Sequence, residues 1–374
     1  MNKNIYFLGA VSFFTDLASA MIAPILPIYI VYILHEGINR LGFIIAAATF
    51  VSYAFRVLFG YLSDRFRIVK PFILFGYVVS AFTKPLFAFS SSYMSITILQ
   101  STERMGKAIR SAPKDFLISY YAKKDESGKS FGMHKTMDIA GELTGTVIVL
   151  FVFHFFGERI DVFKNIFLLT LIPGLIGALI MMFFVEDIKA QHKNKKYSFN
   201  RADYRLFPVI FSYFGFVFFI FSDSFFIISA KEFGYTTALI PVFVIIFTLS
   251  QALCSYYFGT MSDKKSSEFV LKIGYIFGML SIGMLLFDLL WAGFIFLGVF
   301  TVASLNAIRS YISCNAINIS TLYGIFYGGV AVFSSLGALS IGYIWQYFGQ
   351  TNAMIFSLIG MFTVFIIFLY STKE

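Results

Sequence analysis

The stretch Gly60-Tyr61-Leu62-Ser63-Asp64-Arg65 closes an apolar segment immediately before a basic turn that ends at Lys70. A shorter copy, Gly259-Thr260-Met261-Ser262-Asp263-Lys264, closes another apolar segment 199 residues later. Ile109-Arg110-Ser111 recurs at the same 199-residue offset as Ile308-Arg309-Ser310. A repeat at half-chain spacing, placed at the ends of apolar segments, predicts a duplicated membrane bundle.

The composition supports a membrane protein. Hydrophobic residues make up 58% of the 374-residue chain and charged residues 13%, and the mean hydropathy is +0.80. Soluble domains carry about 25% charged residues, and a spanning helix needs about 20 mostly apolar residues. The sequence therefore predicts an all-α integral membrane protein with twelve transmembrane helices in two six-helix pseudo-repeats.

The helices predicted from the apolar segments divide the chain into two bundles. Residues 1–185 form the N-terminal bundle, 186–205 a cytoplasmic linker and 206–374 the C-terminal bundle. The predicted helices are 5–34, 41–62, 72–89, 93–120, 131–156, 163–185, 206–230, 236–262, 268–287, 290–313, 321–346 and 351–371. Basic turns follow helices 2, 4, 6 and 8, so the positive-inside rule predicts a multi-pass protein of the cytoplasmic (inner) membrane with both termini in the cytoplasm.

Several function classes are disfavoured. The net charge of +9 follows the loop pattern and does not indicate nucleic-acid binding. Cys254 and Cys314 lie in apolar segments without metal-ligand spacing, and the phosphate-binding pattern GxxxxGK[ST] does not occur. We therefore expect no enzyme activity and no catalytic residues, no cofactor, no metal site and no direct use of ATP, in a protein that acts as a monomer.

The fourth predicted helix carries an unusual stripe of polar residues. They are spaced by three or four residues and so share one helical face, with Arg104 beside it: Gln100, Glu103, Lys107, Arg110 and Lys114. A charge at a helix centre costs about 2.5–3.5 kcal/mol on insertion scales. This face must therefore contact a watery cavity or oppositely charged partners.

The fifth helix offers such partners, because Lys135, Asp138 and Glu142 also share one face. Counting back from the turn at 122–129 places Asp138 and Glu142 near the depth of Lys107 and Arg110. Two interpretations stay open: a structural charge zipper between helices 4 and 5, or a network whose pairs change during function. His134, at the start of helix 5, is interpreted as an interfacial residue.

Asp16 in helix 1 and Asp223 in helix 7 stand alone in apolar sequence. An ionisable residue inside a membrane is a functional candidate, so each is either a proton carrier or an acid bonded to nearby hydroxyls. Arg309 in helix 10 has no acid near it in sequence. It is expected to hold an anionic substrate or to pair with one of the acids.

The chain resembles members of the major facilitator superfamily over essentially its whole length. The loop 2–3 signature of that family is matched by Gly60, Asp64, Arg65 and Lys70. Further motifs resemble a little-characterised prokaryotic branch: Phe14-Thr15-Asp16 with Pro24 and Pro27, Arg104 to Asp115, and Phe131-Gly132-Met133-His134 with Met137-Asp138 and Gly141.

The resemblance implies roles for some residues. Helices 1, 4, 7 and 10 would line a cavity, and Arg104 would take the place of the helix 4 arginine linked to proton transfer. Asp64 would latch onto the start of helix 11, near Thr321. Gly259 and Asp263 would form the equivalent latch of the second half, although a solvated turn is the alternative for Asp263.

These observations predict a secondary active transporter that moves a small organic solute by alternating access within the lipid bilayer, coupled to protons. Export of an amphipathic metabolite, drug or siderophore-like compound is the first expectation. The alternatives are a divalent-metal or organic-anion carrier, and a membrane scaffold or sensor without transport.

Overall fold

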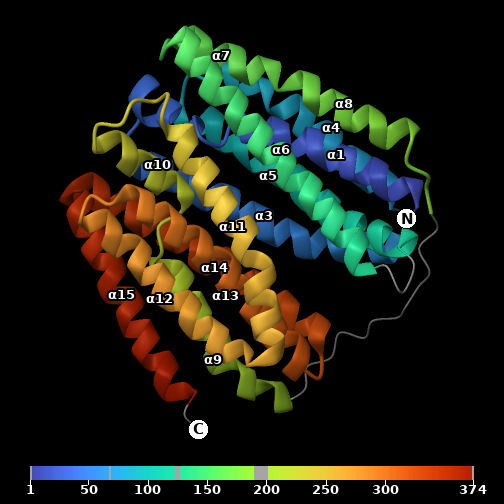
Figure 1. Ribbon diagram of the computed structural model, residues 1–374, viewed down its shortest axis with the longest axis vertical. Coiled ribbons are helices and arrows are strands. Elements are labelled where there is room, and N and C mark those ends of the chain that lie inside the picture. Colours follow the sequence, from blue (N-terminus) through green and yellow to red (C-terminus); the bar gives the residue numbers. More distant parts are fainter. Residues whose placement is uncertain (1, 67–68, 123–126, 189–200, 373–374) are drawn as a thin grey trace. The chain divides into compact units, whose positions relative to one another are not determined.

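The computed structural model describes residues 2–66, 69–122, 127–188 and 201–372, and every regular element in these ranges is a helix (Figure 1). Ten of these helices are long and apolar enough to cross a membrane. Many large apolar side chains are exposed, including Tyr256 at 82% and Phe155 at 72%. Such a surface suits a hydrocarbon solvent and not water.

The first six predicted segments correspond to the elements up to residue 183. They are α1 (Lys3–Ala20), α2 (Leu26–Ile28), the π-helical turn η1 (Tyr29–Ile33), α3 (Ile38–Phe66), α4 (Lys70–Thr83), the 3₁₀ turn η2 (Pro85–Phe89), α5 (Tyr93–Tyr121), α6 (Ser127–Phe156), α7 (Ile160–Leu169) and α8 (Leu171–Phe183). The last six correspond to the 3₁₀ turn η4 (Arg201–Leu206), α9 (Phe207–Phe219), α10 (Asp223–Glu232), α11 (Ile240–Lys264), α12 (Ser267–Leu286), α13 (Leu290–Asn315), α14 (Ile319–Phe348) and α15 (Gln350–Ser371).

Two of the twelve predicted segments are absent from the ten apolar spans. The first segment is broken after α1, and α5 carries six charged residues: Glu103, Arg104, Lys107, Arg110, Lys114 and Asp115. These two elements hold the candidate functional residues of the first half. The part of the interdomain linker at 189–200 lies outside the described residues.

The helices pack as two compact units. Unit 1 comprises residues 1–36, 47–193 and 236–242, and unit 2 comprises 37–46, 194–235 and 243–374. The units thus follow the two halves of the chain except for two short segments, 37–46 and 236–242. These two segments begin 199 residues apart, which is the offset of the sequence repeat.

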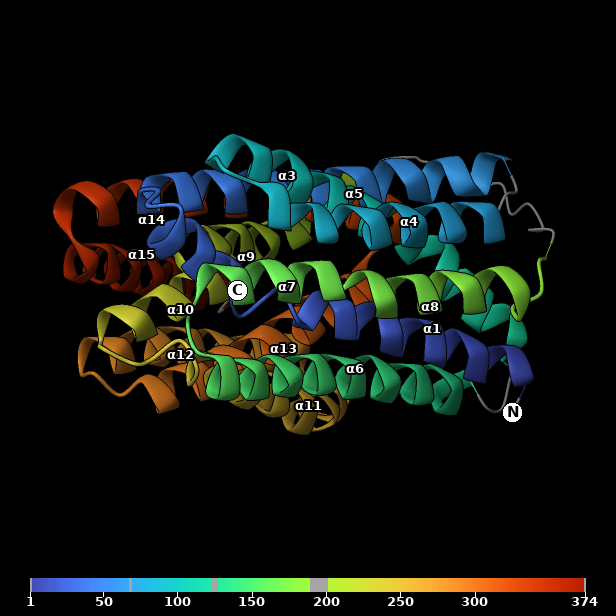
Figure 2. The same cartoon turned by 90° about the horizontal axis from the view of Figure 1, so that it is seen from above.

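In unit 1, α1 packs against α6 and α8, while α4 packs against α5 and α8 (Figures 1 and 2). Two glycines of α6 permit its close approach to α1. A Cβ atom at Gly141 would overlap the backbone of Phe13, and one at Gly145 would overlap the carbonyl of Leu17. The small residues of this pair therefore serve helix packing.

Both units contain the same close crossing. In unit 1 a Cβ at Gly76 of α4 would meet the carbonyl of Gly106 on α5, and in unit 2 a Cβ at Gly274 of α12 would meet Ser304 on α13. Gly274 lies 198 residues after Gly76, and Ser304 lies 198 residues after Gly106. A shared packing contact within one residue of the 199-residue repeat offset supports the duplication that the sequence predicts.

Both units also contain a broken helix at equivalent positions. In unit 1 the α-helical path stops at Ala20 and resumes at Leu26. In unit 2 it stops at Phe219, where Ile220 is extended (φ −73°, ψ 139°), and resumes at Asp223. Met21 and Ile220, the first residues of the two breaks, are again 199 residues apart. Interrupted helices in corresponding positions of two repeats mark binding sites in transporters.

Candidate functional site

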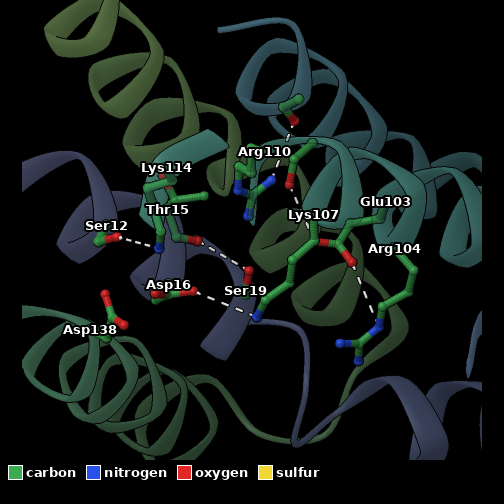
Figure 3. A network of polar contacts seen from close by, with 12 residues as sticks. Ser12, Thr15, Asp16, Ser19, Glu103, Arg104, Lys107, Arg110, Lys114 and Asp138 are labelled. Carbon is green, nitrogen blue, oxygen red and sulfur yellow. Dashed lines mark hydrogen bonds and ion pairs between the residues drawn. The ribbon is translucent and has the colours of Figure 1, made fainter. Parts of the chain in front are cut away.

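Unit 1 holds a polar cluster that the α1, α4, α5 and α6 helices build around the break in α1 (Figure 3). Asp16 lies one turn before the break and is 8% exposed. Its Oδ1 is 3.9 Å from Nζ of Lys107 on α5. The side chain of Lys107 is 38% exposed, so the ion pair has one buried and one accessible member.

The expectation that Asp16 stands alone is therefore wrong. Its partner comes from a helix 91 residues further along the chain, and adjacency in sequence could not reveal it. A carboxylate in such a site is stabilised by the opposite charge. Loss of that charge, by protonation of the acid or by movement of the amine, changes the interaction between α1 and α5.

A second acid of α5, Glu103, is 6% exposed and contacts both α4 and its own helix. Its Oε1 accepts a hydrogen bond of 3.2 Å from Ser80, and its Oε2 lies 3.8 Å from Nε of Arg104. The Arg104 side chain is 43% exposed. Arg104 is thus an accessible cation at the edge of the cluster, next to a buried carboxylate.

Arg110 points in a different direction. It is 4% exposed, its Nη1 donates to the carbonyl of Gly76 at 3.3 Å, and its Cζ lies 4.6 Å from the centre of the Tyr77 ring. Hydrogen bonding to a backbone carbonyl and a cation–π contact both hold the guanidinium against α4. Arg110 consequently stabilises the α4–α5 crossing.

Lys84 is a cluster member that the sequence reasoning missed. It follows α4, is 1% exposed, and donates from Nζ to the carbonyl of Thr15 at 3.2 Å. Glu103 and Asp16 both interact with it electrostatically. A lysine directly before Pro85, at the end of an apolar segment, has the sequence pattern of a loop residue, which hides this role.

The α6 residues make contacts within their own helix and with neighbouring helices. Within α6, Oδ1 of Asp138 lies 3.4 Å from Nδ1 of His134. The ion pair from Lys107 goes to α1, not to Asp138 or Glu142. Lys114 and Asp138 do interact electrostatically between α5 and α6, so the charge zipper and the network of changing pairs both stay predictions.

His134 is buried, with 5% of its surface exposed, so its interpretation as an interfacial residue is wrong. Its Nε2 lies 2.9 Å from Oγ of Ser12 on α1. The same hydroxyl accepts a 3.2 Å hydrogen bond from Nζ of Lys114 on α5. Ser12 therefore joins α5 to α6 and is a further polar residue that the sequence did not single out.

In unit 2, the predicted residues are more dispersed. Asp223 was expected inside an apolar helix, but it is exposed and is the first residue of α10. Its Oδ1 accepts a 2.9 Å hydrogen bond from the backbone of Ser224. The break after α9 produces this position, because it turns a mid-helix residue into a helix start.

Arg309 of α13 lies beside α14. Its Cζ is 6.0 Å from the centre of the Tyr327 ring, and its carbonyl accepts a 2.9 Å hydrogen bond from the hydroxyl of Tyr323. Its Nε is buried and has no hydrogen-bond partner among the described residues. Both units contain an arginine beside a tyrosine ring, but the tyrosines lie on helices that are not equivalent in the repeat, Tyr77 on α4 and Tyr327 on α14.

The residues of the gating prediction are described only in part. The side chains of Asp64, Arg65 and Asp263 lie outside the described residues. Lys70 donates from Nζ to the carbonyls of Met182 and Val185, at 2.8 and 2.6 Å. It therefore caps the end of α8, where backbone carbonyls lack helical partners.

The start of α14 is capped from within unit 2. Asp203 of η4 is 1% exposed and accepts hydrogen bonds from the backbone of Ile317 (2.8 Å) and of Asn318 (3.2 Å). A carboxylate at a helix N-terminus satisfies free N–H groups and interacts favourably with the helix dipole. The helix end at which the sequence places the Asp64 latch thus already has one carboxylate.

The described residues include no group of histidine, cysteine, aspartate or glutamate side chains that could hold a metal ion. The polar cluster of unit 1 instead combines buried carboxylates with partly exposed cations. Buried charges beside a broken helix, in a duplicated bundle of apolar helices, define a membrane transport protein.

Comparison with known proteins identifies the family. The sequence profile of the Major Facilitator Superfamily matches residues 8–317. An uncharacterized MFS-type transporter of the archaeon Methanocaldococcus jannaschii is 33% identical over 369 residues, which covers 92% of this chain and 89% of the relative. The chain belongs to the Major Facilitator Superfamily, and it is a secondary transporter and not an enzyme.

Solved structures confirm the architecture. The nucleoside transporter NupG superposes with a TM-score of 0.77 at 13% identity, over 100% of this chain and 99% of that chain. A bacterial homolog of the human lysosomal transporter Spinster, in an inward-facing and occupied conformation, gives 0.78 at 11% identity, over 99% and 96%. At these identities the likeness shows the fold. The predicted architecture of a twelve-helix major facilitator protein is confirmed.

Proposed function

We propose that this protein is a proton-coupled exporter of a small organic solute, with the Asp16–Lys107 pair as the site where proton and solute meet. The observation that carries the proposal is the 3.9 Å contact between a buried carboxylate and a partly exposed amine, one turn before the break in α1. Interrupted helices in corresponding positions of two repeats are typical of transporter binding sites, and the pair supplies charge next to such an interruption.

The pair links proton and solute by mutual exclusion. A solute with a basic group binds Asp16 only when Asp16 is a carboxylate, and a proton on Asp16 removes that carboxylate. Proton and solute therefore replace each other at one site, which is the requirement for antiport. Lys107 and Arg104 are the accessible cations beside it, so an acidic group on the same solute finds a partner within the cluster. A zwitterionic or amphipathic solute fits this arrangement.

Orientation and assembly complete the proposal. The basic turns after alternate helices support cytoplasmic termini in the cytoplasmic membrane, and the twelve-helix chain contains both repeats that form one transport unit, which supports a monomer. Gly60, Asp64, Arg65, Gly259 and Asp263 retain the gating role that their place at the cytoplasmic helix ends suggests.

The test uses purified protein in liposomes with an imposed pH gradient and a panel of solutes. The panel includes nucleosides, because the structural neighbour NupG is a nucleoside transporter, together with amphipathic amines, zwitterions and organic anions. We expect the gradient to drive uptake of one class. Asp16→Asn should lower gradient-driven flux by about 100-fold, and it should also weaken the binding of solutes that carry a basic group, because the carboxylate is lost.

Lys129→Asn is the matched control, because Lys129 is an exposed cation in the first turn of α6 in the same unit. It should transport like the parent protein. If no solute moves, and Asp16→Asn and Arg104→Ala behave like the parent in every assay, the proposed coupling site is wrong.

An organic-anion carrier is the second candidate. Lys107 and Arg104 favour it, because both cations are partly exposed while their carboxylate partners are buried. In that case Lys107→Met should raise KM for anions roughly tenfold or more without changing the response of other solutes. The divalent-metal alternative has no support in the described residues, since Asp16 has an amine as its partner.

A further inference from the structure

Beside the Asp16–Lys107 pair, unit 1 contains a second group of polar residues. These residues form a chain of successive polar contacts instead of a single ion pair. The chain crosses three helices, from Lys114 on α5 through Ser12 on α1 to His134 and Asp138 on α6. The successive distances are 3.2 Å from Lys114 Nζ to Ser12 Oγ, 2.9 Å from Oγ to His134 Nε2, and 3.4 Å from Nδ1 to Asp138 Oδ1. Figure 3 shows the Lys114–Ser12 bond, with Asp138 on the neighbouring helix.

The donors and acceptors of this chain have one direction. A lysine ammonium group can only donate, so the oxygen of Ser12 accepts from Lys114. When the imidazole carries its own hydrogen on Nδ1, Nε2 of His134 accepts the hydroxyl hydrogen of Ser12. In this neutral tautomer the Nδ1–H faces Asp138, and this is the tautomer that the proposal uses.

The carboxylate of Asp138 gives a second, independent reason to expect proton transfer along these residues. Its Oδ1 is buried and has no hydrogen-bond partner among the described residues, although Nδ1 of His134 is 3.4 Å away. A buried carboxylate oxygen without a hydrogen bond is costly. That cost is removed when the carboxylate takes up a proton, so the end of the chain is built to receive one.

We propose that Lys114, Ser12, His134 and Asp138 form a proton relay that carries protons through unit 1, with His134 as its central exchanging group. In one transfer the Lys114 proton moves to Ser12 Oγ, the Ser12 hydroxyl proton to His134 Nε2, and the Nδ1 proton to Asp138 Oδ1. Ser12 and His134 each gain one proton and lose one. Lys114 ends as a neutral amine and Asp138 as a neutral acid.

The charged groups around His134 come from each helix that packs there. Asp16 of α1 is one turn from Ser12, Lys114 belongs to α5, and Lys135 and Asp138 belong to α6. Glu142 follows Asp138 by one turn of α6 and interacts with Asp16 and Asp138. The relay therefore ends among the same acids that surround the Asp16–Lys107 pair, which gives protons a path to the coupling site.

This inference rests on the proton coupling proposed above, and its test uses protons as the only probe. Protein in liposomes on a solid support is exposed to a jump from about pH 8 to about pH 6, which spans the ordinary range of histidine, without any solute. We expect a transient charge movement in the parent protein. His134→Gln and Ser12→Ala should reduce its rate by roughly tenfold or more.

His154→Gln is the matched control, because His154 lies on the same helix with an exposed ring. It should give the parent signal. If His134→Gln also gives the parent signal while Asp16→Asn abolishes it, the relay is wrong and the coupling site stands. If the parent protein shows no charge movement, proton coupling itself is wrong, and the relay with it.

A structural measurement keeps the proposal testable where a variant fails to fold. The chain has four histidines, so selective ¹⁵N labelling in lipid nanodiscs resolves their tautomers by nuclear magnetic resonance. We expect His134 to be neutral with its hydrogen on Nδ1 at high pH, and to change at Nε2 as the pH falls. A hydrogen fixed on Nε2 at every pH would contradict the relay.

Discussion

Lys84 is 1% exposed, and its Nζ donates to the carbonyl of Thr15 next to Asp16. Breaking a buried charge pair typically costs 3–5 kcal/mol, and Asp16 and Glu103 keep Lys107 and Arg104 as partners when Lys84 is lost, so the lower end of this range is expected. We therefore expect Lys84→Met, which keeps the length of the side chain, to lower the free energy of unfolding by about 3 kcal/mol. Thermal unfolding in detergent micelles measures this change.

The control for Lys84 is Lys135→Met, because Lys135 is exposed on α6. Exposed substitutions usually stay within about 0.5 kcal/mol of the parent. Equal unfolding temperatures for the two variants would show that the buried amine contributes nothing to the α1–α4 contact.

At the end of α8, Glu186 titrates outside the membrane. Hydrogen bonds from Lys3 and Asn4 lower the pKa of Glu186 below its ordinary value, and Oε1 lies 3.0 Å from Nζ of Lys3. An acid with a lowered pKa contributes stability above its unfolded pKa of about 4.3, and that stability is lost as the pH falls through the lower folded value.

Glu186→Gln should therefore remove a small part of the acid destabilisation below about pH 4 and lower the stability slightly at pH 7. The side chains of Lys3 and Glu186 are 70% and 60% exposed, so the change in stability is small. Unfolding temperatures measured from acid to neutral pH test this prediction. A variant curve that parallels the parent curve at every pH would contradict it.

Among the elements, the contact of α6 with α1 depends on two glycines. A Cβ at Gly141 would overlap the backbone of Phe13, whereas a Cβ at Gly132, earlier in α6, meets nothing within 4 Å. We expect Gly141→Ala to push the helices apart and to cost about 1–3 kcal/mol, while Gly132→Ala gains up to about 1 kcal/mol from helix propensity.

The two alanine variants differ only in their place on α6, so a comparison of their unfolding temperatures isolates the packing effect. The relay predicts a second consequence. Separation of α6 from α1 lengthens the path from Ser12 to His134, so Gly141→Ala should also slow the proton movement. An unchanged rate in a destabilised Gly141→Ala protein would separate packing from proton transfer.

The spacing of polar residues predicted the α5 stripe, but it could not predict the partners. Helical periodicity fixes which residues share a face, and Lys107, Arg110 and Lys114 indeed all have polar partners. Their partners lie on α1 and α4, because the order of helices around a bundle is set by tertiary packing. Depth along the membrane, which the sequence does indicate, suggested α6 instead.

The sequence marks only one of the two helix breaks, and it does not reveal the partner of His134. Pro24 and Pro27 indicate an interruption in the first segment, but no proline marks the equivalent break at Ile220. His134 has its polar partner 122 residues away, on α1. A contact of that separation has no local signature, so the sequence left His134 at the membrane interface.

At the scale of the whole molecule, the repeated signature suggests a gate that moves during transport. A Cβ at Gly60 would come no closer than 3.7 Å to another atom, that of Ala112, so a larger side chain fits the structure described here. We expect Gly60→Leu to fold and to bind solute like the parent, but to switch between states roughly tenfold more slowly.

Gly132→Leu is the control, because its surroundings are equally open. Transport rate and solute affinity are measured for both variants in liposomes. Loss of solute binding in the Gly60 variant would show that the glycine belongs to the binding site. An unchanged transport rate would remove it from the gate.

The two exchanged segments have a consequence for the origin of the chain. Residues 37–46 pack within unit 2, where Ile38 donates its backbone N–H to Gln346 (2.7 Å) and Ser335 donates to the carbonyl of Ala46 (2.9 Å). Residues 236–242 pack within unit 1, where both the N–H and the hydroxyl of Thr237 donate to Glu158 at 2.6 Å.

Because the segments occupy equivalent places in the repeat, an ancestor of half this length would have exchanged them reciprocally between two identical subunits, as in a swapped homodimer. Fusion of two gene copies would then have preserved an assembly that already existed. A present-day chain cut within residues 194–200 should therefore remain associated, with fragments 1–193 and 194–374 purifying together from one cell. Fragments that separate would argue that the fusion came before the exchange.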